Sequence, residues 1–197
     1  MTTLLKQNCL LVLLLVTTIT CKANYQPLNK GNSITILVND SLLRHTVLSN
    51  GHPMAVWEKK AENAKGIILF VHGRTWSGVP DFDLQVEGEE LSLMDGLVEQ
   101  GYSTYAIDLR GYGKTPRDAT EWSSPEIASN DILNVLNWIS KENNKTKVHL
   151  FGWSMGSTLS LLATQKESKN IAINTFIYAR YGLKTTVRGS EKMCRIS

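Results

Sequence analysis

The sequence predicts an α/β fold in which a mostly parallel β-sheet carries helices on both faces. Two observations carry this prediction. Apolar runs such as Gly66–Val71 are continuous, as expected of parallel strands buried on both faces. These runs alternate along the chain with amphipathic stretches of helical periodicity, which is the order of elements in an α/β sheet. With 197 residues, 42% of them hydrophobic, the chain is long enough to bury one core.

Six stretches are expected to be strands. Each is rich in aliphatic, β-branched or aromatic residues, and turn-forming residues bound most of them. The pair Asn50-Gly51 predicts a turn before the second strand. In chain order, the predicted strands are Ile34–Val38, Met54–Trp57, Gly66–Val71, Tyr102–Leu109, Lys147–Phe151 and Ile171–Ala179.

Three stretches are expected to be helices. Apolar residues recur at helical spacing from Leu91 to Val98, and Gly101 ends that helix. Pro125 opens the second helix, because proline is favoured at the first helical position. The third helix, Ser157–Thr164, follows a glycine-flanked serine. The apolar face of the second helix comprises Ile127, Ile132, Val135, Leu136 and Ile139.

The first 23 residues have the pattern of a secretory signal peptide. Lys6 precedes the apolar run Cys9–Val16, which is too short to cross a bilayer. Cleavage after Ala23 satisfies the preference for small residues at the cleavage site. A second possibility is lipidation of Cys21, the route by which we expect any membrane attachment. An uncleaved membrane anchor is a third and less favoured alternative. Either of the first two exports the protein to the periplasm, the envelope or the medium, with residues 24–33 as a linker.

Composition excludes several classes of function. The formal charge is only +3 and the basic residues are scattered, so no nucleic-acid partner is expected. Three cysteines do not describe a disulfide framework. No Cys/His cluster has the spacing of metal ligands, and we predict neither a metal nor a cofactor.

The most informative motif is Gly152-Trp153-Ser154-Met155-Gly156, between an apolar strand and a helix. A serine on a sharp strand-to-helix turn needs neighbours almost without side chains, and glycine meets that need. The turn also leaves the N–H of Met155 at the start of the helix, where it faces a developing oxyanion. The motif predicts that Ser154 is a nucleophile.

Two further loops follow predicted strands. His72-Gly73-Arg74 comes directly after Gly66–Val71, and a glycine-rich loop, Asp108-Leu109-Arg110-Gly111-Tyr112-Gly113, closes the Tyr102–Leu109 strand. The carboxyl ends of parallel strands lie at one edge of a sheet, and in such folds the chemistry gathers there. We therefore expect both loops to lie beside Ser154.

In this order, the three motifs resemble those of the α/β-hydrolase superfamily, over about residues 34–180. The resemblance implies a serine hydrolase acting on a small acyl substrate, an ester, thioester or amide. It makes Ser154 the nucleophile and the backbone N–H groups of Arg74 and Met155 the oxyanion hole. It assigns a role in shaping the loops to His72, Gly73, Asp108, Arg110, Gly152 and Gly156.

The chain departs from the superfamily pattern after the nucleophile. The superfamily order is Ser, then Asp or Glu, then His, yet no Asp or His follows Ser154. No catalytic acid or base is therefore found, and the later strands are missing. The tail 181–197 is basic and loses periodicity, as a frameshift or premature stop near residue 180 would produce.

Two hypotheses follow from this departure. The first is an exported α/β-hydrolase that is C-terminally truncated and catalytically incomplete as this chain. The alternative is a non-catalytic binding scaffold with a hydrolase-like fold, completed by a partner along the exposed edge of the sheet.

Overall fold

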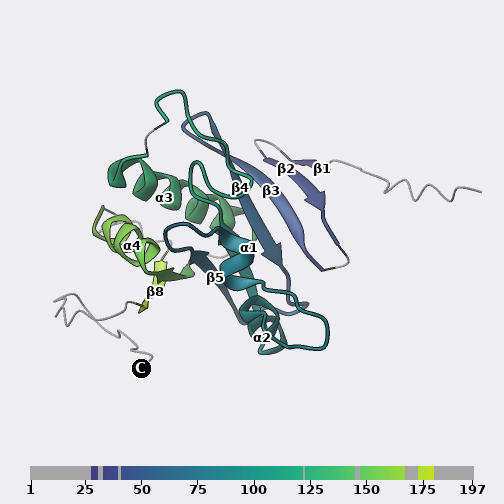
Figure 1. Ribbon diagram of the computed structural model, residues 1–197. Coiled ribbons are helices and arrows are strands. Elements are labelled where there is room, and N and C mark those ends of the chain that lie inside the picture. The colour runs from purple at the N-terminus through teal and green to yellow at the C-terminus, as the bar shows by residue number, and fades with distance from the viewer. Residues whose placement is uncertain are drawn as a thin grey trace, which may run out of the picture.

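The computed structural model describes residues 28–30, 33–39, 41–121, 123–144, 147–166 and 173–179, which form one mixed sheet with helices on both faces (Figure 1). The eight described strands lie in the order β1-β2-β3-β4-β6-β5-β7-β8. They are β1 (Leu28–Lys30), β2 (Ser33–Leu37), β3 (Leu43–Ser49), β4 (His52–Lys59), β5 (Gly66–Val71), β6 (Tyr102–Ile107), β7 (Val148–Trp153) and β8 (Ile173–Ala179). The helices are α1 (Gly78–Phe82), α2 (Leu93–Glu99), α3 (Pro125–Glu142) and α4 (Met155–Lys166).

The predicted α/β class with helices on both faces is confirmed, and the parallel part of the sheet comprises β6, β5, β7 and β8. The N-terminal strands β1 to β4 add an antiparallel part, joined to the parallel part where β4 pairs with β6. Strand β1 falls within the segment 24–33 that the sequence predicted to be a linker. The predicted signal peptide and the tail 181–197 lie outside the described residues.

Strand β3 was not predicted, and the reason lies in its inward-facing residues. Two of the three buried positions are polar, His45 and Ser49, so the apolar alternation of a half-buried strand is missing. Their partners come from elsewhere in the chain. The His45 ring contacts the Glu58 carboxylate at 2.7 Å, and Ser49 donates a hydrogen bond to Asp131 at 2.6 Å.

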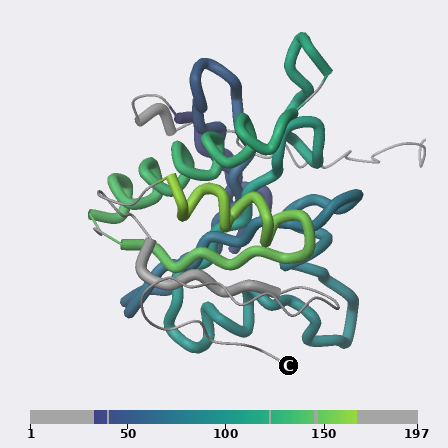
Figure 2. Tube along the Cα trace, turned by 90° about the vertical axis from the view of Figure 1, so that its left-hand side faces the viewer, coloured from purple at the N-terminus to yellow at the C-terminus, as the bar shows by residue number. Residues whose placement is uncertain are grey.

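The sheet separates two hydrophobic cores, one on each face. Successive residues of a strand point to opposite faces. Ile67, Leu69 and Val71 therefore join the core beneath α3 and α4, whereas Ile68 and Phe70 join the core beneath α1 and α2. Figure 2 shows α3 and α4 side by side on their face of the sheet. This two-sided burial explains why β5 reads as a continuous apolar run.

The register of the three central parallel strands brings their carboxyl ends to one level. Val71 of β5 lies opposite Ile107 of β6 on one side and Gly152 of β7 on the other. The loops that begin at His72 and Asp108 and the turn at Ser154 therefore share one edge of the sheet, as predicted. We call this edge the loop edge.

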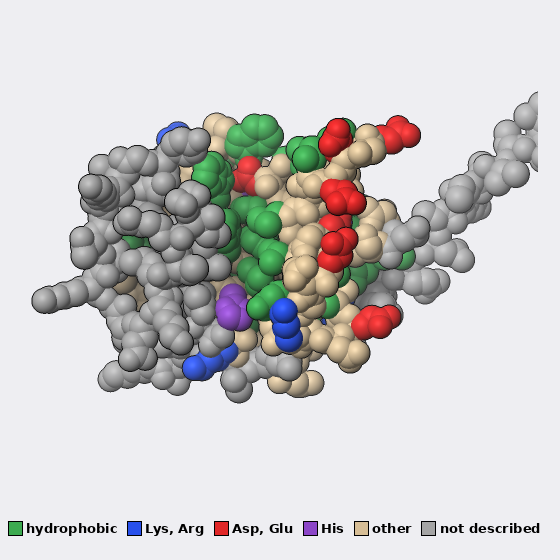
Figure 3. All heavy atoms as spheres, turned by 90° about the horizontal axis from the view of Figure 1, so that it is seen from below, with side chains coloured by type: hydrophobic (Ala, Val, Ile, Leu, Met, Phe, Trp, Pro, Cys, Tyr) green, Lys and Arg blue, Asp and Glu red, His purple; other side chains and the backbone are tan. Residues whose placement is uncertain are grey.

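The opposite end of the sheet is where the parallel strands begin, next to α2. Seen from that end, the surface carries a row of acidic side chains beside a band of hydrophobic ones (Figure 3). At the lateral edge, β8 pairs with β7 and has no second neighbour among the described strands. Within the residues described, no helix is long and apolar enough to cross a membrane.

A buried lysine fastens the two short helices to the sheet. The ammonium group of Lys59, on β4, contacts Asp83 at the end of α1 and Asp95 within α2, each at 2.6 Å. Ser92, which caps α2, also donates to Asp83 at 2.6 Å. The side chains of Lys59 and Asp83 are 4% and 1% exposed, so the charges compensate each other away from water.

Replacing this lysine should destabilise the fold strongly. Lys59→Met leaves the Asp83 carboxylate buried without its cation, and we expect the free energy of unfolding to fall by about 3 kcal/mol in urea denaturation. Lys60→Met is the matched control, because Lys60 is 62% exposed and its contact with Glu58 spans 3.5 Å. The control should change stability by less than about 1 kcal/mol. Equal losses in both variants would contradict this account of Lys59.

Candidate active site

Ser154 occupies a strained turn between β7 and α4. Its backbone φ is +51°, in the left-handed region that non-glycine residues rarely adopt. The residue is exposed, and α4 begins at the next residue, Met155. The turn closes with two hydrogen bonds, from Ser157 N–H to the Ser154 carbonyl at 3.1 Å and from Ser157 Oγ to the Gly152 carbonyl at 2.6 Å. The serine is therefore raised above the sheet by a fixed backbone.

The two flanking glycines are required by close backbone packing. A Cβ atom at Gly156 would lie 2.2 Å from the carbonyl oxygen of Val71, and one at Gly152 would lie 2.6 Å from the Cα of Ser157. Both separations are far shorter than van der Waals contact. The turn thus packs directly onto the end of β5, which brings the loop after β5 against the serine.

The loop after β5 meets the serine through Gly73. A Cβ atom on Gly73 would lie 3.2 Å from the Cβ of Ser154 and 2.8 Å from Cδ1 of Trp153. The Gly73 N–H donates to Asp81 at 3.0 Å, which anchors the loop to α1. Arg74 follows, and then Thr75 with a φ of +74°. The structure therefore places Arg74 one residue from the serine contact, and its role in an oxyanion hole stays a prediction.

His72 connects this loop to the glycine-rich loop. Its ring is fully buried, Nδ1 lies 2.7 Å from the Gly73 carbonyl oxygen, and Nε2 accepts the N–H of Leu109 at 3.0 Å. Because a carbonyl only accepts and an N–H only donates, Nδ1 carries the proton and the ring is neutral. Burial holds the pKa of His72 below its usual value. Both ring nitrogens are engaged, so His72 has none to offer Ser154.

Asp108 supports the glycine-rich loop from beneath. Its buried carboxylate accepts hydrogen bonds from the indole of Trp57 at 2.9 Å, from Gly78 N–H at 2.7 Å and from Lys114 N–H at 2.8 Å. A Cβ atom at Gly113, whose φ is +51°, would lie 2.2 Å from the same carboxylate. One carboxylate thus holds β4, the start of α1 and the glycine-rich loop together.

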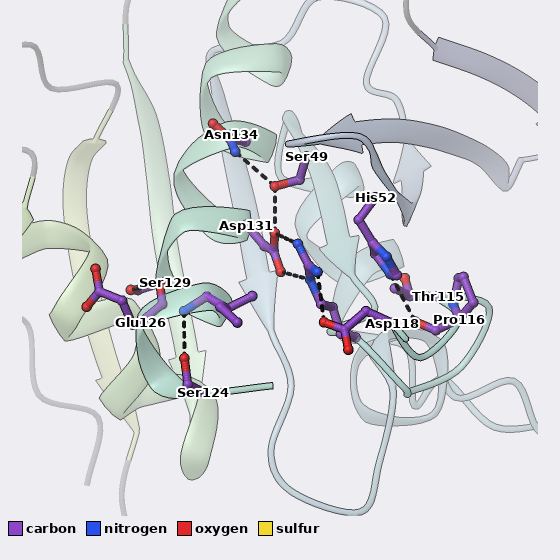
Figure 4. Close-up of polar contacts among 12 residues, drawn as sticks. Ser49, His52, Thr115, Pro116, Asp118, Ser124, Glu126, Ser129, Asp131 and Asn134 are labelled. Carbon is purple, nitrogen blue, oxygen red and sulfur yellow. Dashed lines mark hydrogen bonds and ion pairs between the residues drawn. The ribbon is translucent and has the colours of Figure 1, made fainter. Parts of the chain in front are cut away.

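Arg110 is paired with two carboxylates, which sequence reasoning did not identify. Its guanidinium binds Asp131 through two hydrogen bonds of 2.7 and 2.9 Å and Asp118 through one of 3.1 Å (Figure 4). The hydrogen bond to Asp131 raises the pKa of Arg110. Ser49 donates to Asp131, and Asn134 donates to Ser49 at 2.8 Å. The sequence did contain a signal for this pairing. Asp131 lies on the apolar face of α3, and a buried carboxylate needs partners.

No described imidazole serves Ser154 as a base. His45 contacts Thr35 and Glu58, and His52 contacts the Pro116 carbonyl at 3.0 Å. His149 lies near the start of β7, opposite Ile68, away from the loop edge, with its ring against Tyr102. His72 is engaged as described above. The described residues also contain no group of His, Cys, Asp and Glu that could hold a metal ion.

A pocket of about 640 Å³ opens beside Ser154, next to Met155. We call the buried apolar side chains of its lining, which come from the glycine-rich loop, α3 and α4, the floor. We call the charged and hydroxyl side chains of the lining the rim. The residues that line it include Arg74, Leu109, Arg110, Arg117, Asp118, Glu121, Ala128, Met155 and Leu159. The pocket is therefore lined by Met155, the residue that follows Ser154, and by Arg74 of the loop after β5.

Comparison with known proteins agrees with this architecture. A family model described as the alpha/beta hydrolase fold matches residues 66–178, more than half of the chain. The protein therefore belongs to the alpha/beta hydrolase family. No curated protein matches the chain.

Solved structures show the same fold. A laboratory-evolved variant of potato epoxide hydrolase superposes with a TM-score of 0.57 and 22% identity over 71% of this chain and 39% of that chain. A predicted CIB-like hydrolase from Thermoplasma acidophilum superposes with a TM-score of 0.55 and 18% identity, over 70% of this chain and 62% of that chain. An esterase from Exiguobacterium antarcticum superposes with a TM-score of 0.50 and 24% identity, over 66% of this chain and 42% of that chain. The chain thus spans between 39% and 62% of the length of these relatives.

The packing at Gly156 gives a sharp test of the turn. Gly156→Ala places a methyl group against two backbone carbonyls, which cannot move without displacing β5, and we expect a loss of at least about 3 kcal/mol or no folded protein. Gly96→Ala, within α2 and with nothing within 4 Å, is the control. It should be stabilising by up to about 1 kcal/mol, because alanine is the better helix former. Thermal unfolding followed by circular dichroism measures both, and a Gly156→Ala protein of native stability would contradict the packing.

Proposed function

We propose that the protein is the nucleophile-bearing part of a serine hydrolase that cleaves esters, thioesters or amides. The observation that carries the proposal is Ser154 itself, exposed, at a φ of +51° and at the start of α4. Strained backbone of this kind is concentrated at functional sites. Gly156 lets the turn approach the end of β5, and Gly152 leaves room for the backbone of Ser157 within the turn.

The proposed chemistry is acyl transfer through an acyl-enzyme. The Ser154 hydroxyl oxygen bonds to the substrate carbonyl carbon, and the bond from that carbon to the leaving group breaks. The serine proton passes through a base to the leaving group. Water then attacks the acyl-enzyme, releases the acid and restores the hydroxyl. The first N–H groups of a helix have no partner within the helix, so Met155 N–H is suited to stabilise the oxyanion, together with Arg74 N–H.

The base is the element this chain does not supply. A neutral serine hydroxyl is a weak nucleophile and needs an adjacent base. The four histidines are engaged or remote, and the sequence has no histidine after His149. We propose that the acid and base belong to a segment beyond residue 180 that this chain lacks, and that the chain by itself is catalytically incomplete.

This proposal predicts almost no esterase activity for the chain alone. Hydrolysis of p-nitrophenyl butyrate should match that of a Ser154→Ala variant within experimental error, because the hydroxyl is not activated. Rapid hydrolysis that Ser154→Ala abolishes would show that a base is present. It would overturn the proposal that the chain by itself is catalytically incomplete.

Resequencing the gene past codon 180, with translation in every frame, tests the parent function. We expect a continuation that encodes an Asp and then a His, and the restored chain should hydrolyse the ester. There Ser154→Ala should lower kcat at least about 10³-fold. If no frame supplies these residues, the second candidate function, a binding scaffold that uses the pocket without catalysis, is favoured. The observation behind this second candidate is the engagement of both nitrogens of His72.

We also propose that the first 23 residues export the protein. The support is the short apolar run Cys9–Val16 after Lys6. Mass spectrometry of the mature protein from its native cells should find either Asn24 or a lipidated Cys21 as the first residue. An intact Met1 would contradict export by cleavage.

A further inference from the structure

The pocket beside Ser154 combines an apolar floor with a rim that carries two arginines, Arg74 and Arg117, without an ion-pair partner among the described residues. Leu109, Ala128 and Leu159 are almost fully buried and form apolar parts of its wall. Met155, next to the serine, continues this surface and packs on the same core. An aliphatic chain can therefore lie along the floor with one end at Met155, next to Ser154, in a volume typical of small-molecule sites.

The charges of the rim are unequally compensated. Arg110 is held by Asp131 and Asp118, so its charge is neutralised within the protein. Arg74 and Arg117 line the same pocket, are exposed, and form no side-chain hydrogen bond or ion pair within the described residues.

The remaining acidic side chain of the lining is Glu121. Among the described residues, Glu121 forms no ion pair with either arginine, so both guanidinium groups keep their donors available. The N-terminus of α4 adds a partial positive charge beside Met155. The rim therefore offers an anion two arginines that no carboxylate of the described residues pairs with.

Arg117 packs against the glycine-rich loop. Its Cγ atom lies 3.1 Å from the position of a Cβ on Gly111, whose φ is +77°. The side chain thus rests on the glycine-rich loop, where a β-carbon would crowd it. This packing limits the freedom of the aliphatic stem and keeps the guanidinium at the rim.

From this arrangement we infer that the substrate is an ester or thioester whose aliphatic acyl chain ends in a carboxylate. The inference rests on the proposal that Ser154 is the nucleophile. The scissile carbonyl lies at Ser154 and the chain follows the apolar floor. The terminal carboxylate pairs with Arg117 and Arg74, whose guanidinium groups suit a carboxylate geometrically.

Binding by the chain as it exists tests this inference without turnover. Isothermal titration calorimetry compares the monomethyl esters of adipic, suberic and sebacic acid with the corresponding dimethyl esters, which lack the charge. We expect at least one monoester to bind about tenfold more tightly than its diester. The double variant Arg74→Gln/Arg117→Gln should lose this preference while its affinity for the diester is unchanged. Lys114→Gln is the matched control and should keep the preference. Lys114 is an exposed cation directly after the glycine-rich loop, and it does not line the pocket.

Three results would overturn the inference: equal affinities of monoester and diester, no binding of either, or a preference that persists in the double variant. Ser154→Ala should bind the monoester as the unsubstituted chain does. If the hydrolase proposal is wrong, the esterase and gene-sequencing experiments reveal it. If only the ligand assignment is wrong, these titrations alone reveal it.

Discussion

The buried ring of His72 is the contact on which the geometry of the loop edge depends. It joins two loops that the sheet alone does not connect, because Nδ1 donates to the Gly73 carbonyl and Nε2 accepts the Leu109 N–H. Burial keeps the ring neutral, and a neutral ring is the form that can donate at one nitrogen and accept at the other. The contact that joins the two loops thereby engages both nitrogens of the imidazole that lies at the loop edge.

The serine turn depends on the same strand end. Gly156 lies so close to the carbonyls of Val71 and His72 that the turn, β5 and the start of the His72 loop form one packed body. Asp108 extends this body to β4 and α1 through its three buried hydrogen bonds. The result is the proposed nucleophile held in position by backbone packing, with a pocket beside it and no activating imidazole among the described residues. Positioning and activation are separate tasks in this fold, and the described residues perform the first.

Features with a local cause were predictable from the sequence. The turn at Ser154 needs glycines at two fixed offsets, and α3 shows both its proline start and its apolar period, so each was found. Strand β3 was missed because His45 and Ser49 face inward, and their partners Glu58 and Asp131 are 13 and 82 residues away. Helix α1 was missed because its five residues are too few to show a period. The pocket could not be predicted from the sequence, because its lining comes from separated loops and two helices.

The protonation of His72 tests the central claim most directly, because the claim makes this ring a neutral structural link and leaves Ser154 without a base. Nitrogen-15 NMR of the histidine-labelled chain, assigned with His72→Asn, reports the tautomer and the titration of the ring. The account predicts a proton on Nδ1 and a ring that stays neutral below pH 6.5, the ordinary pKa of histidine. A ring that carries its proton on Nε2, or that becomes an imidazolium near pH 6.5 in the folded protein, would contradict the account and return His72 to consideration as the missing base.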